Sequence, residues 1–147
     1  MGQSVSPDVE IKLHEYVESQ IGLPFQFGRN DCPLFTLGAV DIMCGTEYKW
    51  QFVGKWTDQK SAWKYAKKHG DIYHHLQSYG FKRVDIQFIQ VGDILIMAQD
   101  LAHAKKWRSV AVCMGSKVAI VTNETGVELV NIRDVPNVTG VVRWQSA

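Results

Sequence analysis

The sequence predicts an α+β domain in which N-terminal helices pack on a C-terminal antiparallel sheet, or half-barrel, of about five to six strands. Two observations predict this class. From about residue 6 to residue 80, apolar residues recur at the three- and four-residue spacing of helices. From about residue 81 to residue 145, they recur at every second position, with turn sequences between the runs. Helices followed by strands are typical of α+β folds, whereas alternation would indicate a parallel sheet.

Length and composition fit one globular unit. The chain has 147 residues, of which 46% are hydrophobic and 21% charged, which is enough apolar material for one core. We therefore expect residues 1–147 to form a single domain. The net charge of +1 gives no basic excess for nucleic-acid binding. We also expect no signal peptide and no membrane anchor, because neither an N-terminal apolar run nor a long apolar stretch is present.

Each predicted helix has start and stop signals. Ser6 supplies a hydroxyl N-cap, Pro7 fits the first turn, and Gly22 follows the last apolar residue. A second helix starts at Asp31 or Cys32 and is closed by Gly45. The segments that follow are a packed loop at 46–57 and short helices at 61–69 and 72–79.

The second half of the chain reads as strands joined by tight turns. Gly115-Ser116 and the Glu-Thr-Gly sequence at 124–126 are turn formers, so neighbouring strands are expected to form hairpins. The predicted strands are 91–97, 109–114, 117–122, 127–132 and 138–144.

Cys32 is the strongest candidate for a reactive residue in the sequence. In the first turn of a helix it would face unpaired backbone N–H groups and the positive end of the helix dipole, and both favour the thiolate. Gly28 would let the backbone turn sharply in front of it. The alternative is that Cys32 is a small buried apolar residue, as free cysteines usually are.

Four ordered segments carry a resemblance to a known family. Residues 24–35 read Pro-Phe-x-Phe-Gly-x-x-Asp-Cys-x-x-Phe, Gly92-Asp93 opens an apolar strand, and similar strands follow at 109–115 and 118–127. This set resembles the NlpC-type papain-like cysteine peptidases. It is most similar to a divergent branch found in the tail-tip and baseplate gene clusters of long-tailed bacteriophages.

The resemblance implies a catalytic pair that is only half present. Cys32 matches the nucleophile of the family, but Ser109 stands where the family has its histidine. Val121 stands near the third, polar position. A serine hydroxyl cannot act as a general base near neutral pH. The resemblance therefore implies a degenerate site.

Other histidines offer alternatives. His103 is in the predicted loop before the strand at 109–114 and is a second candidate catalytic residue; the alternative is an exposed loop histidine. His74 and His75 are adjacent on a helix and point to different faces, which makes a poor metal pair. Since no histidine clusters with a cysteine or carboxylate in the sequence, we expect no metal and no cofactor.

An aromatic-rich insertion at 48–63 separates the second and third predicted helices. Its aromatics have three interpretations: core packing, a sugar-stacking platform, or anchors for another protein. We expect part of the insertion to contact a partner, with Trp50, Phe52 or Trp56 as the anchor.

These observations favour a structural subunit of a phage tail tip or baseplate. The expected partners are other tail-tip proteins, namely the hub and distal tail proteins, and the expected location is the virion after synthesis in the host cytoplasm. The alternative is an active cysteine endopeptidase or amidase that cleaves peptidoglycan peptides during genome delivery. A free-standing cellular hydrolase is a third hypothesis.

Overall fold

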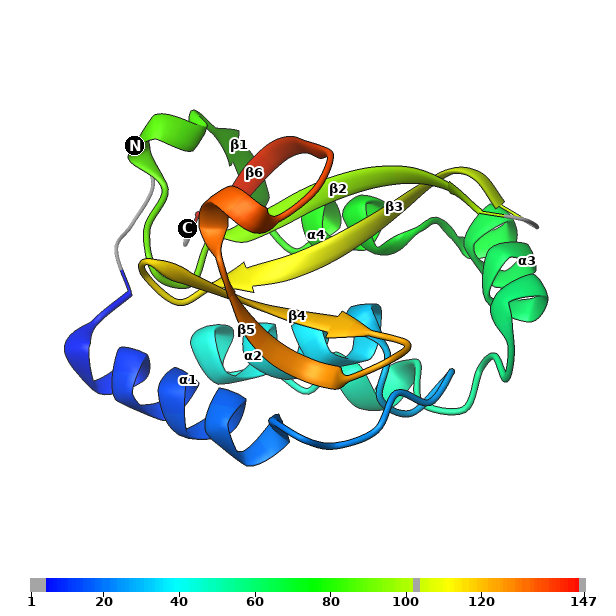
Figure 1. Cartoon of the computed structure of the whole chain (residues 1–147), viewed down its shortest axis with the longest axis horizontal. Coiled ribbons are helices and arrows are strands. Elements are labelled where there is room, and N and C mark those ends of the chain that lie inside the picture. The colour runs from blue at the N-terminus through cyan, green and yellow to red at the C-terminus, as the bar shows by residue number, and fades with distance from the viewer. Residues whose placement is uncertain (1–4, 102–103, 146–147) are drawn as a thin grey trace.

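A computed structural model describes residues 5–101 and 104–145 of the chain. The first half is helical and the second half is a sheet, as the periodicity predicts (Figure 1). The helices are α1 (Pro7–Gln20), α2 (Cys32–Cys44), α3 (Gln59–His69) and α4 (Ile72–Ser78). The strands are β1 (Phe81–Val84), β2 (Ile94–Leu101), β3 (Ala104–Cys113), β4 (Lys117–Thr122), β5 (Gly126–Asn131) and β6 (Val138–Trp144). Three short 3₁₀ turns are η1 (Lys49–Gln51), η2 (Ile86–Phe88) and η3 (Ile132–Asp134).

The six strands form one antiparallel sheet in the order β1-β6-β2-β3-β4-β5. This architecture confirms the predicted α+β class. Strand β1 is a short edge strand that the period-two pattern did not resolve, and it pairs with β6 from Phe81 opposite Trp144. The ladder between β2 and β3 runs beyond the predicted strand ends, so β3 begins before Ser109.

The two faces of the sheet belong to two separate hydrophobic clusters. Ile94 and Ile96 of β2 face the helices and join the larger cluster. Leu95 and Met97, which alternate with them, face the other side and join a smaller cluster with Val135 near η3. Both faces of these strands are therefore covered by apolar residues, which is why the strands read as continuous apolar runs in the sequence.

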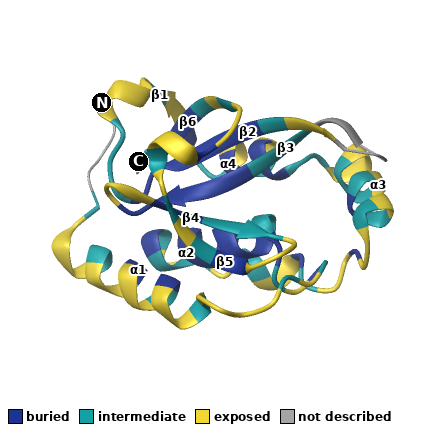
Figure 2. Cartoon of the chain, in the orientation of Figure 1, coloured by how far each residue is buried: buried dark blue, intermediate teal, exposed yellow. Residues whose placement is uncertain are grey.

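Helix α2 contacts both the first helix and the sheet. Its N-cap is Asp31, whose carboxylate accepts a hydrogen bond from the backbone of Leu34, and Gly45 ends it in the left-handed region at φ 67°. The helix lies against β3 and β4, with α1 on its other side. Figure 2 shows α2 and the middle strands as the most continuously buried part of the chain. This placement confirms the prediction that Cys32 begins a helix packed across the sheet.

A buried ion pair joins strand β6 to the residue that precedes strand β2. The Arg143 Nε and Nη2 atoms donate to the two carboxylate oxygens of Asp93, each at 2.8 Å. Arg143 Nη2 also donates to the Phe88 carbonyl, and the backbone N–H of Gln90 donates to Asp93. The Gly-Asp sequence before β2 thus joins β2, β6 and the η2 segment through one carboxylate.

The aromatic insertion is mostly core, which corrects part of the expectation above. Phe52 and Trp56 are each only 7% exposed and belong to the larger cluster. Tyr48 stacks on Tyr79 with ring centroids 3.7 Å apart. The prediction that Phe52 or Trp56 anchors an interface is therefore wrong, because both side chains are buried in the hydrophobic core. Trp50, by contrast, is 73% exposed.

Within residues 5–101 and 104–145, no helix is long and apolar enough to cross a bilayer.

Candidate functional site

The turn before α2 is built around the buried carboxylate of Asp31. One oxygen, Oδ2, accepts hydrogen bonds from the Gly28 backbone at 2.9 Å and from the Trp56 indole at 2.7 Å. The other, Oδ1, accepts from the Leu34 backbone at 3.1 Å. Asp31 is 3% exposed, and its burial raises the pKa of the carboxyl against the opposing effect of these hydrogen bonds. The Asp-Cys motif thus sets the start of α2 and ties it to the aromatic insertion.

Gly28 is required at this turn for two separable reasons. Its φ is +76°, and a Cβ added there would lie 2.0 Å from the Trp56 carbonyl oxygen. We expect Gly28→Ala to lower the free energy of unfolding by about 2 kcal/mol or more, through left-handed strain plus the clash. The matched control is Gly54→Ala, since Gly54 has φ +79° but no atom within 4 Å of its added Cβ. Urea unfolding measures both, and equal losses would contradict the clash.

Cys32 is the first residue of α2 and faces strand β3. The Val110 backbone and the Ser109 side chain lie beside its sulfur, where both act to lower the pKa of the thiol. Even so, burial and the nearby charge of Asp31 raise the pKa of the thiol to about 12. The expectation that Cys32 is present as the thiolate is therefore wrong here, because desolvation and the neighbouring carboxylate raise the pKa of the thiol by more than Val110 and Ser109 lower it. At neutral pH Cys32 is a thiol.

Ser109 is held in place by its neighbours on the sheet. It pairs with Met97 in the β2–β3 ladder, and the adjacent Gln99 side chain donates to its Oγ at 3.3 Å. Val121 of β4 lies on the same cavity as Cys32 and Ser109. The structure thus brings together the three positions that the resemblance selected. His103, the other candidate, lies outside the described residues.

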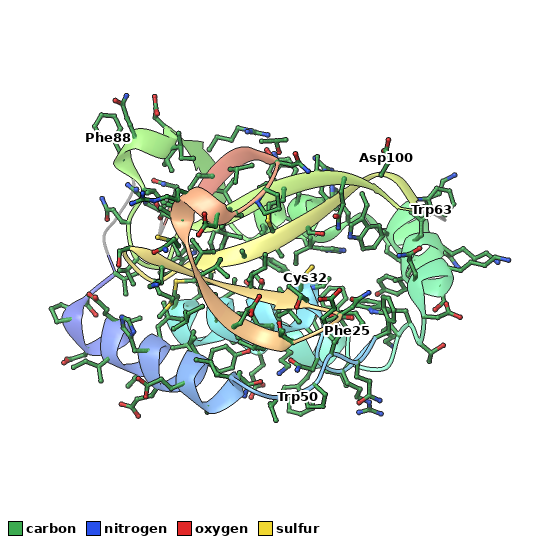
Figure 3. All side chains as sticks on the ribbon, viewed as in Figure 1. Phe25, Cys32, Trp50, Trp63, Phe88 and Asp100 are labelled. Atoms are coloured by element: carbon green, nitrogen blue, oxygen red, sulfur yellow. The ribbon has the colours of Figure 1, made fainter. Side chains whose placement is uncertain are left out.

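A cavity of about 160 Å³ opens beside Cys32, between α2, α3, α4 and the sheet. Six of its lining residues carry Phe, Tyr or Trp side chains. Figure 3 shows Cys32 between α2 and the strands, whereas Trp50 and Phe88 lie at opposite edges of the molecule. The aromatic residues of this cavity, called the aromatic cavity below, are Phe25, Phe27, Phe52, Trp56, Tyr65 and Trp107.

His75 is a polar cavity residue that the sequence did not single out. Its ring contacts Phe52, with centroids 4.9 Å apart, and stacks near Tyr79 at 6.3 Å. Its Nε2 atom is shielded from solvent and has no hydrogen-bond partner among the described residues. Burial, followed by the neighbouring His74, lowers the pKa of His75, so the imidazole is neutral at pH 7. Nothing local in the sequence distinguishes it from His74, since only the packing of α4 selects one of the two.

An ion pair lies at the rim of the aromatic cavity. Arg108 Nε donates to the Asp71 carboxylate at 2.6 Å, and the guanidinium lies 4.5 Å from the centre of the Tyr73 ring. Both side chains are partly exposed, so the pair contributes about 1 kcal/mol or less to stability. Its position joins the start of α4 to β3 at the mouth of the cavity.

The donor set for a metal is missing from the described part of the chain. No group of three or more His, Cys, Asp or Glu side chains converges within residues 5–101 and 104–145. Cys32, Cys44 and Cys113 are all free thiols.

Residues 4–138 match the family described as Domain of unknown function (DUF6950). The chain belongs to this family. The match covers the turn at Gly28, the start of α2 at Cys32 and the position of Ser109, so the DUF6950 domain includes the whole candidate site. No curated protein matches the chain.

Solved structures show which fold this DUF6950 chain has. An NLP/P60 family protein from Staphylococcus aureus, described as similar to lipoprotein, superposes with a TM-score of 0.60 at 13% identity, over 99% of this chain and 44% of that one. An NlpC/P60 family protein from Bacillus cereus gives 0.56 at 20% identity, over 93% and 40%. The chain therefore has the NlpC/P60 fold, and it spans less than half the length of these two proteins.

Proposed function

We propose that the protein is a structural subunit of a bacteriophage tail tip or baseplate, built on a cysteine-hydrolase fold whose catalytic site has degenerated. One observation carries the loss of catalysis: the thiol of Cys32 faces the hydroxyl of Ser109, with Val121 nearby. Neither Ser109 nor Val121 takes a proton at neutral pH, and the thiol is itself held protonated. The phage setting rests on the similarity of the four motif segments to the tail-tip branch.

The test of the degenerate site is a peptidoglycan-release assay on the purified chain. We expect no more peptide release from wild type than from Cys32→Ala, because general acid–base assistance worth about 10² to 10⁴ in rate is missing. Release that depends on Cys32 would instead support the alternative, an active endopeptidase or amidase that assists genome delivery. His103 would then be the first candidate base, and His103→Ala would be expected to abolish the release.

The assembly partners of this proposal are the hub and distal tail proteins, within the virion, after synthesis in the host cytoplasm. Trp50 on η1 is the aromatic that remains available as an anchor, because it is exposed while Phe52 and Trp56 are buried. Exposed tryptophans are typical anchors of protein interfaces.

We expect Trp50→Ala, in a phage that encodes the chain, to weaken subunit attachment by about 2 kcal/mol or more while the isolated subunit stays folded. Electron microscopy of tails and infectivity measure the assembly, and circular dichroism measures the fold. Phe88→Ala is the matched control, since Phe88 is 64% exposed on the far side of the molecule (Figure 3). Normal tails with Trp50→Ala would contradict this anchor.

A further inference from the structure

The aromatic cavity has the size of a single ring. Its volume is about 160 Å³, and cavities of about 150 Å³ are known to hold one benzene molecule. A sugar strand or a peptide of several residues would not fit inside. One planar side chain would fill the space, with its ring edges against the walls in the arrangement that aromatic pairs prefer.

The wall also contains a buried polar atom that lacks a hydrogen-bond partner among the described residues. Two buried polar side-chain atoms lack a hydrogen-bond partner within residues 5–101 and 104–145, Thr36 Oγ1 and His75 Nε2. Of these two residues, only His75 lines the cavity. A buried polar atom without a partner is unfavourable, and such atoms in proteins are usually satisfied by a neighbour, a water or a ligand. The cavity therefore favours a ring that brings a hydrogen-bonding group with it.

We propose that the aromatic cavity binds one tyrosine side chain of a partner polypeptide, with the phenol hydroxyl hydrogen-bonded to His75 Nε2. A phenol hydroxyl both donates and accepts, so it satisfies Nε2 in either tautomer of a neutral imidazole. Exposed amide side chains, Gln99 and Asn123, line the same cavity and suit the backbone N–H and C=O groups on either side of such a tyrosine. That the ring belongs to a protein rests on the proposed assembly role.

Three soluble probes test the ring and its hydroxyl on the full chain. N-acetyl-tyrosinamide, N-acetyl-phenylalaninamide and N-acetyl-alaninamide are titrated while the indole N–H signal of Trp56 is followed by NMR, since Trp56 lines the cavity. We expect the tyrosine probe to bind about tenfold more tightly than the phenylalanine probe, and the alanine probe to give no saturable shift. Equal binding of the tyrosine and phenylalanine probes to wild type would overturn the assignment without any variant.

Two variants test whether His75 is the residue that recognises the hydroxyl. His75→Phe keeps an aromatic ring beside Phe52 but removes Nε2, so the tenfold preference for the tyrosine probe over the phenylalanine probe should disappear. His74→Phe is the matched control and should keep the preference, because His74 is an exposed neighbour on the same helix that does not line the cavity. A preference that survives in His75→Phe would overturn the role of Nε2.

A fourth probe identifies the source of the ring. 4-Methylphenol has the same ring and hydroxyl without the peptide groups. Tighter binding of N-acetyl-tyrosinamide than of 4-methylphenol supports a polypeptide, and equal binding would overturn that part of the proposal in favour of a free phenol. These outcomes are independent of the tail experiment, because Trp50 lies outside the cavity and its variant tests assembly alone.

Discussion

Asp93→Ala is expected to lower the free energy of unfolding by about 3 to 5 kcal/mol. The substitution leaves Arg143 buried with its positive charge uncompensated, and the desolvation of such a charge is not recovered elsewhere. It also removes the acceptor for the Gln90 backbone N–H. For a chain of this size the midpoint of thermal unfolding should fall by about 10 °C, which differential scanning calorimetry measures.

The double variant Asp93→Ala with Arg143→Leu separates the ion pair from the packing around it. Because it removes both charges, it should recover more than half of the lost stability. Asp134→Ala is the matched surface control and should change stability by about 0.5 kcal/mol or less, since Asp134 is exposed on η3. A loss in Asp93→Ala no larger than in this control would show that the pair is not structural.

Ser109→His is expected to raise the alkylation rate of Cys32 at pH 7 by about 10² to 10⁴. Ser109 already lies beside the sulfur, so an imidazole at this position gains a route to accept the thiol proton and stabilise the thiolate. In wild type the raised pKa, about 12, keeps the thiol protonated across the neutral range, so its reaction should accelerate only in alkali. In the variant, the acceleration should begin near neutral pH.

The alkylation experiment has internal controls. Iodoacetamide labelling read by mass spectrometry reports all three thiols at once, and the rates of Cys44 and Cys113 should not change, because neither lines the aromatic cavity. Ser109→Asn controls for the loss of the hydroxyl, since its amide does not titrate. An unchanged Cys32 rate in a folded Ser109→His variant would show that position 109 cannot supply the missing base.

The helices and the sheet were predictable because their signals are local. Ser6 and Asp31 are caps whose side chains bond the first turn, Gly45 ends α2 in a left-handed conformation, and the strand residues alternate between two apolar faces. The edge strand β1 escaped because four residues are too few for a period to appear. Its pairing with β6 is set by contacts about sixty residues apart in the sequence.

The site was predictable only where a motif marks it. Cys32 and Ser109 were found through the ordered segments, and the structure places them together. The protonation state of the Cys32 thiol could not be predicted, because the sequence indicates the start of the helix but not how deeply the thiol is buried. His75 and the bond from Trp56 to Asp31 were missed for the same reason, since each depends on how separate helices and loops pack.

The sheet order has a consequence for how the protein is made. Strand β6 is last in the sequence but second in the sheet, between β1 and β2. While the ribosome is still translating, β2 to β5 can pair in hairpin order, but β1 has no partner and β2 has one open edge. That open edge is a template for pairing with other chains. We expect nascent chains shorter than residue 138 to be sensitive to protease and prone to aggregate, and release of the β6 segment to be the step that commits the chain to its native topology.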